Sequence, residues 1–374
     1  MNVLLVFGTR PEAIKMVPVA KALAASPRCQ VTICVTAQHR GMLDQVLDLF
    51  SVTPDIDFDL MKPGQDLSDI TTRVLLSMRD LLASKPFDLV LVHGDTTTSF
   101  AAGLAAFYAG IPVGHVEAGL RTGDLSAPFP EEYNRKATAI VTALHFAPTE
   151  RSRQNLLAEG YDDSTIHVTG NTVIDALLET ADRLEKDETL AAGCFEKVPT
   201  SSEKRTILVT GHRRENFGHG FEQICDGLAR LAERDDVEII YPVHPNPKVL
   251  EAVHRRLGGR DNVRLIEPLD YLPFVDLMRR SHIILTDSGG IQEEAPSLSK
   301  PVLVMRDVTE RPEAVEAGTV KLVGTDSDRL YQTATRLLDD DDHYAAMAYA
   351  HNPYGDGKAA ERIVTLIEQW WERR

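Results

Sequence analysis

The chain has 374 residues, of which 43% are hydrophobic and 26% charged, and its formal net charge is −16. This length accommodates two α/β domains of ordinary size, and the composition is that of a globular rather than a disordered protein. The excess of negative charge argues against nucleic acid or an anionic membrane surface as the main partner. A small anionic ligand remains compatible with it, because such a ligand needs only a local basic pocket.

An apolar, β-rich run at residues 2–7 opens the chain, without a basic segment or a long apolar stretch before it. We therefore expect neither a signal peptide nor a membrane span, and a cytoplasmic location. The cysteines, at positions 29, 34, 194 and 225, show no Cys-x-x-Cys spacing and no neighbouring histidine cluster. We expect reduced thiols and no structural zinc.

Apolar runs alternate with helical patterns along the chain. The first half contains expected strands at residues 3–7, 31–36, 89–93, 113–116, 145–147 and 167–168. The second half contains expected strands at residues 206–210, 238–243, 263–265, 283–286, 302–305 and 320–322. Strands that are apolar throughout and separated by helices indicate parallel sheets covered on both faces. The predicted fold class is α/β, with two Rossmann-like, doubly wound domains and the ligand in the interdomain cleft, at the carboxyl ends of the strands.

The natural domain break follows Gly170-Asn171, which predicts domains at residues 1–170 and 171–355. The charged stretch 183–205 lacks a clear pattern, and we expect it to be exposed surface. The final segment, 356–374, reads as a helix with its apolar positions close to one face, and we expect it to pack back on the first domain. No Gly-x-Gly-x-x-Gly follows any strand, which weakens a dinucleotide-oxidoreductase interpretation.

Polar residues follow the first expected strand. Thr9 and Glu12 have the spacing of a capping box, and Pro11 suits a first helical turn. Arg10 would then lie at the mouth of the sheet, with Lys15 about one turn along. This cationic pair suits a diphosphate, and the alternative for these two residues is a solvated helix face.

Three carboxylates in the first half are candidates for a catalytic group. Asp95 and Glu117 come just past apolar strands, and Glu131 lies on a loop that opens a helix. Carboxylates gathered in a partly desolvated cleft can have shifted pKa values and can serve as general acid and base. The commoner role of any one of them is to cap a helix, but three in one domain favour a catalytic group.

The second half offers an anion site. The strand at 283–286 leads into Ser288–Gly290 and a helix-forming segment, where glycines and free N–H groups let a phosphate approach closely. Glu294, about one turn into that helix, could accept hydrogen bonds from a ribose diol, and Arg311 should approach the same turn. His212, past another strand, could donate to a phosphate or shuttle a proton. The alternatives are an ordinary βα turn with a capping serine and a hydrogen-bonded turn histidine.

Seven segments are distinctive as a set: Gly8–Glu12, His93–Thr96, His115–Arg121, Pro130–Arg135, His212–Asn216, Asp287–Glu294 and Thr309–Glu313. Together they resemble the non-hydrolysing UDP-N-acetylglucosamine (UDP-GlcNAc) 2-epimerases of bacteria, and the resemblance runs from Met1 to the C-terminal helix. It implies a glycosyltransferase-B-like fold and the interconversion of UDP-GlcNAc with UDP-N-acetylmannosamine (UDP-ManNAc). It also implies a role in cell-surface polysaccharide biosynthesis, a homodimer, and neither cofactor nor metal.

The resemblance assigns roles to individual positions. Residues that would hold UDP are Arg10, Lys15, His212, Phe274, Ser288, Gly289, Gly290, Glu294 and Arg311. The catalytic group would comprise Asp95, Glu117, Glu131 and His212. A second UDP-GlcNAc, acting as an activator, would bind at Gln38, His39, Gln65 and His244. Gly41 and Gly64 stand where a polar and a basic side chain are expected, so we predict weak or absent activation.

The implied chemistry agrees with these residue types. The proton on sugar C2 has no adjacent carbonyl, so its direct abstraction would be very slow. Departure of UDP from C1 builds oxocarbenium character and acidifies the C2 hydrogen, which favours elimination to a 2-acetamidoglucal and re-addition of UDP. The site must stabilise the leaving diphosphate and place an acid and a base near C2. It needs no NAD and no metal.

Three other functions fit the same architecture. A UDP-sugar-dependent glycosyltransferase would need an acceptor site and would not need three carboxylates. A hydrolysing epimerase would release free ManNAc, and a non-catalytic nucleotide-sugar sensor would release nothing. Incubation with UDP-GlcNAc alone separates the alternatives by product.

Overall fold

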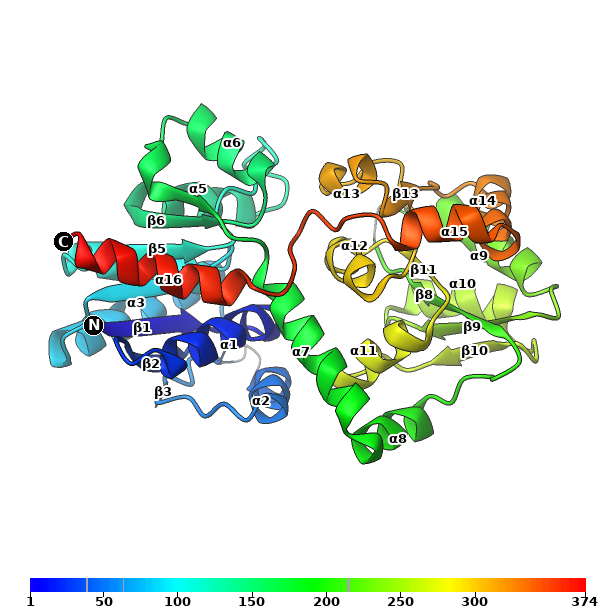
Figure 1. Ribbon diagram of the computed structural model, residues 1–374, viewed down its shortest axis with the longest axis horizontal. Helices are drawn as coiled ribbons and strands as arrows, with labels where there is room; N and C mark the ends of the chain where they lie inside the picture. Colours follow the sequence, from blue (N-terminus) through cyan, green and yellow to red (C-terminus); the bar gives the residue numbers. More distant parts are fainter. Residues whose placement is uncertain (38–39, 63, 214–215) are drawn as a thin grey trace. The chain divides into compact units, whose positions relative to one another are not determined.

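The computed structural model describes residues 1–37, 40–62, 64–213 and 216–374. Contacts within these ranges divide the chain into two compact units, unit 1 at Met1–Ala176 with Tyr354–Arg374 and unit 2 at Leu177–Pro353. The first division falls inside helix α7 (Thr172–Lys186). The final helix, α16 (Ala359–Glu372), belongs to unit 1, where it packs against α1 (Arg10–Ala25) (Figure 1).

Unit 1 is a parallel sheet with helices on its faces. Its strands are β1 (Asn2–Phe7), β2 (Gln30–Val35), β3 (Ile56–Asp57), β4 (Leu89–His93), β5 (Val113–Val116), β6 (Thr142–Ala147) and β7 (Ile166–Val168). Over the described residues they form a seven-stranded sheet in the order β3-β2-β1-β4-β5-β6-β7. Its other helices are α2 (Arg40–Leu49), α3 (Leu67–Ser84), α4 (Thr97–Tyr108), α5 (Glu131–Val141), α6 (Glu150–Ala158) and the short η1 (Asp163–Thr165).

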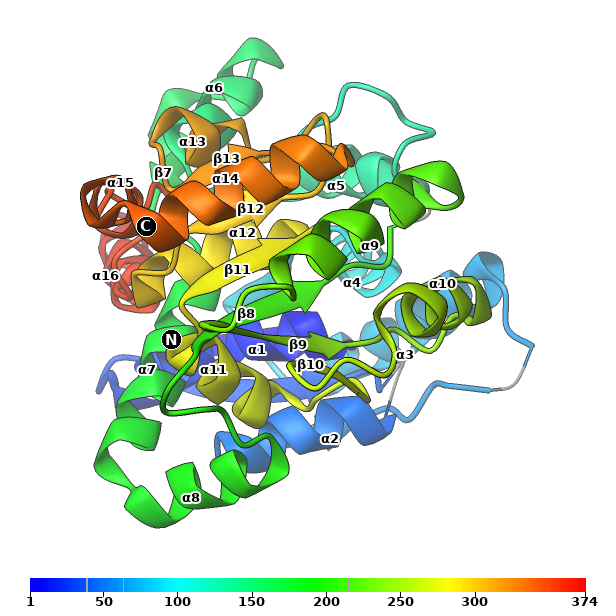
Figure 2. The ribbon, with the colours of Figure 1, turned by 90° about the vertical axis from the view of Figure 1, so that its right-hand side faces the viewer.

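Unit 2 repeats this plan. Its strands are β8 (Arg205–Thr210), β9 (Val237–Pro242), β10 (Val263–Ile266), β11 (Ile283–Thr286), β12 (Val302–Val304) and β13 (Val320–Leu322). In the part of the chain that is described they form a six-stranded parallel sheet, β10-β9-β8-β11-β12-β13 (Figure 2). Its helices are α8 (Glu188–Lys197), α9 (His219–Leu231), α10 (Pro247–Leu257), α11 (Tyr271–Arg280), α12 (Gly289–Glu294), η3 (Ala295–Leu298), α13 (Pro312–Glu316), α14 (Ser327–Asp339) and α15 (Asp341–Ala348).

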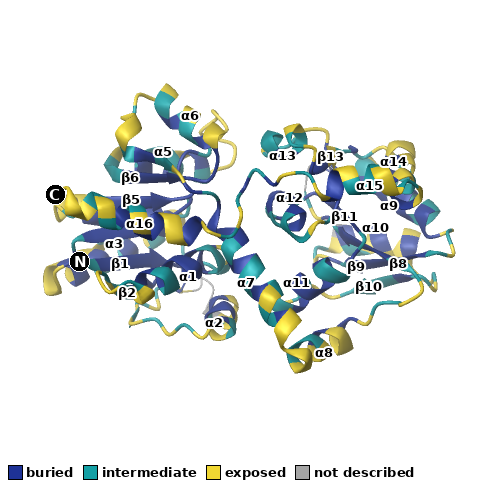
Figure 3. Cartoon of the chain, viewed as in Figure 1, coloured by how far each residue is buried: buried dark blue, intermediate teal, exposed yellow. Residues whose placement is uncertain are grey.

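The expected strands are all present, with bounds within three residues of the prediction. Their uniform apolarity has the expected cause: residues 3–7 of β1 are fully buried, because helices cover both faces of the sheet (Figure 3). Strand β3 was not predicted, since a strand of two residues has no periodicity to detect. The stretch 183–205 is largely exposed, as predicted, but it contains α8, which is anchored by the buried Cys194 and Val198.

The strand order reverses at the same point in both sheets, between β1 and β4 in unit 1 and between β8 and β11 in unit 2. In open parallel sheets, ligands bind beyond the carboxyl ends of the strands at such a reversal. The segments that directly follow these four strands contain Arg10, at the start of α1, and Asp95, His212 and Ser288 in loops. The fold therefore places predicted site residues at the switch point of each sheet.

A buried carboxylate, Glu12, fixes the turn between β1 and α1. The predicted capping box is confirmed, with the Glu12 side chain accepting the Thr9 backbone N–H at 2.8 Å and the Thr9 hydroxyl capping the helix in return. The other Glu12 oxygen accepts the hydroxyls of Thr96 at 2.7 Å and Ser99 at 3.2 Å. Glu12 thus ties the end of β1 to the first turn of α4, beside the loop that contains Asp95.

Three further observations bear on the class of protein. Within the described ranges, no helix is long and apolar enough to cross a lipid bilayer. The four cysteines are unpaired. The same part of the chain contains no group of three or more His, Cys, Asp or Glu side chains arranged to hold a metal ion.

Two neighbouring histidines lie inside unit 1. His115 on β5 and His145 on β6 are register partners, and both are buried. Burial lowers the pKa of His115 to about 3 and that of His145 to about 4. The Nε2 atom of His115 lies 2.7 Å from the Gly94 carbonyl oxygen, which places a neutral imidazole directly beneath the loop that carries Asp95.

We predict that acid destabilises unit 1 through these imidazoles. An unfolded histidine gains its proton near pH 6.5, whereas His115 stays neutral until about pH 3, so stability is full above pH 6.5 and falls as the pH drops toward the folded pKa. The loss for His115 is about 2–3 kcal/mol by about pH 4.5. His115→Gln should therefore flatten the dependence of the urea midpoint on pH, and the exposed-site control His254→Gln should not. An unchanged slope in His115→Gln would show that protonation of His115 does not set the acid sensitivity of unit 1.

Candidate functional site

A buried, charged carboxylate lies at the carboxyl edge of the unit 1 sheet. Glu117, just past β5, has a left-handed backbone with φ of 64°, which non-glycine residues rarely adopt. Its Oε1 accepts hydrogen bonds from Lys15 Nζ at 2.5 Å and Asn171 Nδ2 at 3.0 Å. Its Oε2 lies 3.1 Å from Nε2 of His93. Both oxygens of Glu117 therefore have close polar neighbours.

The charge state of Glu117 follows from these neighbours. Burial alone raises the pKa of the Glu117 carboxyl, but the Lys15 ammonium and the His93 imidazole outweigh burial and hold that pKa well below its usual range. Glu117 is consequently ionised at neutral pH. Lys15, expected beside Arg10 as a diphosphate ligand, is ion-paired with Glu117, while Arg10 is the first residue of α1.

Asp95 lies at the neighbouring strand end, past β4. The Gly94 N–H donates to the Val116 carbonyl at 2.9 Å, which extends the β4–β5 pairing and brings the loops of Asp95 and Glu117 side by side. Oδ2 of Asp95 accepts hydrogen bonds from Nε of Arg135 at 3.0 Å and is 2.7 Å from its Nη2. The structure thus brings two of the three predicted carboxylates to adjacent strand ends.

The third carboxylate, Glu131, is the first residue of α5. Its Oε2 is buried and has no hydrogen-bond partner among the described residues. A buried, unsatisfied carboxylate oxygen is costly, and such groups are common where a ligand completes the site. Residues of the same helix, Asn134 and Arg135, contact Asp95, so α5 links the regions of Glu131 and Asp95.

In unit 2, a buried aspartate organises the loop after β8. Oδ2 of Asp287 accepts the backbone N–H groups of His212 and Arg213, each at 2.8 Å. Its Oδ1 is 3.7 Å from Nδ1 of His212 and has no hydrogen-bond partner within the described chain. The His212 ring stacks on His244 with centroids 5.1 Å apart and planes 12° apart.

Burial lowers the pKa of His212; Asp287 opposes this effect, and His244 and Arg213 add to it. The imidazole is therefore neutral at neutral pH, and it can accept a proton. Its backbone is held by Asp287, so the ring has a defined starting position at the switch point of the unit 2 sheet.

Helix α12 follows β11 directly, as expected from the Ser-Gly-Gly turn. Ser288 is its N-cap residue, but the Ser288 side chain makes no capping hydrogen bond. A Cβ atom added to Gly289 would lie 3.7 Å from the guanidinium carbon of Arg311 and 4.0 Å from Nη2 of Arg213. The predicted approach of Arg311 to this turn is confirmed. The buried Glu293 pairs with Nε of Arg311 and holds the guanidinium there.

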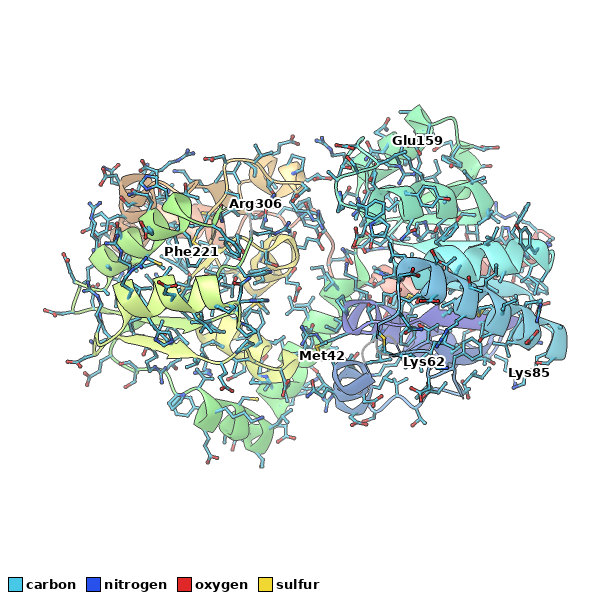
Figure 4. All side chains as sticks on the ribbon, turned by 180° about the vertical axis from the view of Figure 1, so that it is seen from behind. Met42, Lys62, Lys85, Glu159, Phe221 and Arg306 are labelled. Carbon is cyan, nitrogen blue, oxygen red and sulfur yellow. The ribbon has the colours of Figure 1, made fainter. Side chains whose placement is uncertain are left out.

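The loop between β12 and α13 is stiffened by a second arginine. Arg306, labelled in Figure 4, is almost completely buried and forms a two-pronged pair with Glu310, with N···O distances of 2.7 and 3.0 Å. The hydrogen bonds from Arg306 lower the pKa of Glu310 to about 2. This pairing fixes the backbone immediately before Arg311.

The remaining predicted nucleotide ligands lie on two helices of unit 2. Phe274 is a half-buried residue in the first turn of α11, and Glu294 is the last residue of α12. Oε1 of Glu294 would lie 3.4 Å from a Cβ atom at Gly290, so the carboxylate is directed back along the Ser-Gly-Gly turn.

The predicted effector residues are only partly described. Gln38 and His39 lie outside the described residues. The side chain of Gln65 is engaged locally, accepting the Lys62 N–H at 2.6 Å and donating to the Leu60 carbonyl at 3.0 Å. Gly64 has a φ of 77°, a conformation that disfavours the basic residue expected there.

Several residues in contact with these sites were not assigned a role from sequence. Three of them lie inside the distinctive motifs, namely His93, Arg135 and Asp287. The spacing of those motifs does not indicate which residues these three side chains contact. Asn171 was noted only as part of a domain break. Its position between a glycine and the start of a helix was a signal that the sequence offered for it.

Comparisons with known proteins extend over the whole chain. A family profile described as UDP-N-acetylglucosamine 2-epimerase matches residues 21–368. The probable UDP-N-acetylglucosamine 2-epimerase of Ralstonia nicotianae is 62% identical over 372 residues, which cover 99% of both chains. The UDP-N-acetylglucosamine 2-epimerase of Salmonella typhimurium is 59% identical over 372 residues, again 99% of both. The Neisseria meningitidis UDP-GlcNAc 2-epimerase, solved bound to UDP-GlcNAc, is 51% identical, with a TM-score of 0.90 over 99% of this chain and 100% of that chain.

Two Rossmann-like sheets, each with charged side chains at its switch point, define a glycosyltransferase-B-like protein, and the predicted fold class is confirmed. Within that class, the chain belongs to the UDP-N-acetylglucosamine 2-epimerase family.

Proposed function

We propose that the protein is a non-hydrolysing epimerase that interconverts UDP-GlcNAc and UDP-ManNAc. The observation that carries this proposal is the placement of Asp95 and Glu117 at adjacent strand ends, in a chain that matches the epimerase family along its length. The Neisseria relative was solved with UDP-GlcNAc bound, which supports the choice of substrate.

We infer an elimination and re-addition. A base removes the C2 proton as the C1–O bond to UDP breaks, and the electron pair forms the C1–C2 double bond of a 2-acetamidoglucal. UDP then adds back to C1 while an acid delivers a proton to the opposite face of C2. Arg10, His212 and Arg311 would stabilise the charge on the leaving diphosphate. The proposed chemistry requires no cofactor and no metal.

The carboxylates differ in a way that supports a division of roles. Glu117 is ionised and both its oxygens have close polar neighbours, so it is a poor proton donor and suits an electrostatic role that fixes Lys15. Asp95 has one oxygen bound to Arg135, and Glu131 has a buried oxygen without a partner in the described residues. We propose that Asp95 and Glu131, with His212, carry the proton transfers.

Most of the residues proposed to hold the nucleotide belong to unit 2. Gly289 and Gly290 have no side chain that would block a phosphate from the backbone. The Ser288 hydroxyl makes no capping hydrogen bond to the helix, so it can donate to the phosphate. Glu294 would accept hydrogen bonds from the ribose diol, and Phe274 would pack against the nucleoside. Arg311, aligned by Glu293, would pair with the diphosphate.

Incubation with UDP-GlcNAc alone should yield UDP-ManNAc at equilibrium, and in deuterium oxide both epimers should carry deuterium at C2. The reason is that the proton leaves C2 for a side chain that exchanges with solvent. Proton NMR of the mixture measures both results. Free ManNAc with UDP would indicate hydrolysis, an unchanged substrate would indicate a transferase or a sensor, and epimerised product lacking deuterium after long incubation would contradict the proton-transfer mechanism.

Asp95→Asn, Glu117→Gln and Glu131→Gln should each lower kcat by about 10²–10⁴-fold, since each removes a charge or a proton-transfer group near C2. UDP affinity by calorimetry should change little for the Asp95 and Glu131 variants. Arg362→Ala, which breaks a surface pair with Asp356, is the control and should turn over normally. Near-normal turnover in all three variants would exclude the proposed catalytic group.

The predicted effector site has glycines at two positions where side chains were expected. Gly41 has no atom within 4 Å of an added Cβ, and Gly64 is left-handed, so neither supplies a group to a second UDP-GlcNAc. A second doubly charged ligand needs charge-assisted contacts of roughly 1.5–3 kcal/mol each. We propose that the set Gln38, His39, Gln65 and His244 binds such a ligand weakly or not at all.

Accordingly, the reverse reaction started from UDP-ManNAc should begin without a lag when no UDP-GlcNAc is present. Progress curves with and without a trace of UDP-GlcNAc measure this directly. A long lag that a trace of UDP-GlcNAc removes would show that the four residues suffice for activation and that the two glycines do not abolish it.

We also propose that the protein is a homodimer. Large apolar side chains are exposed on adjacent helices of unit 1, with Leu76 on α3, Phe107 and Tyr108 on α4, and Ile140 on α5. Such a surface favours burial against a second copy of the chain. Light scattering should therefore give twice the 41.3 kDa chain mass, and Tyr108→Glu should lower it toward one chain. A monomeric unaltered protein would contradict the proposal.

A further inference from the structure

Helix α5 contacts Asp95 through more than one side chain. Nδ2 of Asn134 donates to the Asp95 backbone carbonyl at 2.9 Å. Nε and Nη2 of Arg135 both reach Oδ2 of Asp95, at 3.0 and 2.7 Å. No described residue hydrogen-bonds to Oδ1 of Asp95. One oxygen of this carboxylate is thus anchored by the protein, and the other is left for a ligand.

Arg135 is itself held from its other side. Nη1 of Arg135 donates to Oε2 of Glu132 at 3.0 Å, and Glu132 has no solvent exposure. The two oxygens of Glu132 also accept the backbone N–H groups of Thr122 and Gly123, each at 3.1 Å. Glu132 therefore connects Arg135 to the start of the loop that runs into α5 and Glu131.

A gain in folding stability does not by itself explain why Glu132, Arg135 and Asp95 are arranged in this way. A buried ion pair gains little over well-packed apolar side chains of similar volume, because both charges lose their hydration. An arginine does fix direction, since Nε and Nη2 of its rigid, planar guanidinium both reach Oδ2 and hold that oxygen in one position. The arrangement is consequently better suited to orienting Asp95 than to stabilising the helix.

We propose that Arg135 is a positioning residue of the epimerase site, aligned by Glu132, which anchors Oδ2 of Asp95 and turns Oδ1 toward the sugar. This inference rests on the proposed function and adds a residue to the same site. It predicts that loss of Arg135 leaves the substrate bound but misplaces the proton-transfer group. A misplacement of about 1 Å can cost about 100-fold in rate.

The test compares Arg135→Ala with Lys136→Ala, a control one residue along the same helix. Lys136 pairs with Glu159, labelled in Figure 4, and neither contacts Asp95. Arg135→Ala should lower kcat by about 100-fold while KM changes by less than about threefold. Millimolar guanidinium should restore at least about tenfold of the lost kcat, and equal ammonium should not. Lys136→Ala should retain kcat within about twofold.

Two further variants keep the proposal testable if Arg135→Ala fails to fold. Arg135→Lys keeps the charge but loses the fork, and Glu132→Gln keeps the volume but loses an acceptor for Arg135. Each should lower kcat by about tenfold or more with KM nearly unchanged.

Normal turnover in folded Arg135 variants would overturn this inference alone. A fall in kcat that guanidinium does not rescue, accompanied by a lower melting temperature, would also overturn it, because that pattern indicates a structural role. If the unaltered protein does not epimerise UDP-GlcNAc, the proposed function fails, and this inference fails with it.

Discussion

The negative charge of Glu117, held inside the protein at the end of β5, is the constraint on which the unit 1 site depends. A buried carboxylate is stable only when charged or polar groups surround it. Here those groups come from three elements, with Lys15 on α1, His93 at the end of β4 and Asn171 just before α7. One charge therefore sets the relative positions of a helix, a strand end and a helix start.

The backbone at Glu117 forms a tight turn with positive φ angles. Glu117 itself is left-handed, and Gly119 follows with a φ of 91°. A Cβ atom on Gly119 would lie 2.3 Å from the Ser152 carbonyl oxygen, so only glycine fits the turn that leads away from the site. The strain of a left-handed glutamate is of order 1–3 kcal/mol, and the ion pair with Lys15 offsets it locally.

The neighbouring carboxylates differ from Glu117 in how many of their oxygens the protein contacts. Glu117 has polar neighbours on both oxygens, Asp95 has one anchored oxygen, and Glu131 has a buried oxygen that the described protein leaves unsatisfied. Protein contacts thus decrease from the residue proposed to act by charge to the residues proposed to move protons. In unit 2, Asp287 plays the comparable part for His212, fixing its backbone rather than joining the chemistry.

Local features were predictable from sequence, and pairings between distant segments were not. The strands, the turn after β11 and the Thr9–Glu12 capping box follow from patterns of a few residues, which local physics determines. The Lys15–Glu117 pair joins residues 102 positions apart, and the Asp95–Arg135 pair joins residues 40 apart. The register of the sheet determines which distant residues meet, and local sequence patterns do not reveal it. Lys15 was therefore expected as a phosphate ligand, and its ion pair with Glu117 was missed.

The ionisation of Glu117 can be measured directly. Carbon-13 NMR of protein labelled at the glutamate carboxyl carbons can follow it, with the Glu117 signal assigned from its absence in Glu117→Gln. We expect a carboxylate chemical shift that stays constant from about pH 8 to below about pH 4.5, because the folded pKa lies well under the ordinary value. A titration of that signal with a midpoint at or above about pH 4.5 would show that Lys15 and His93 do not hold Glu117 in its charged form.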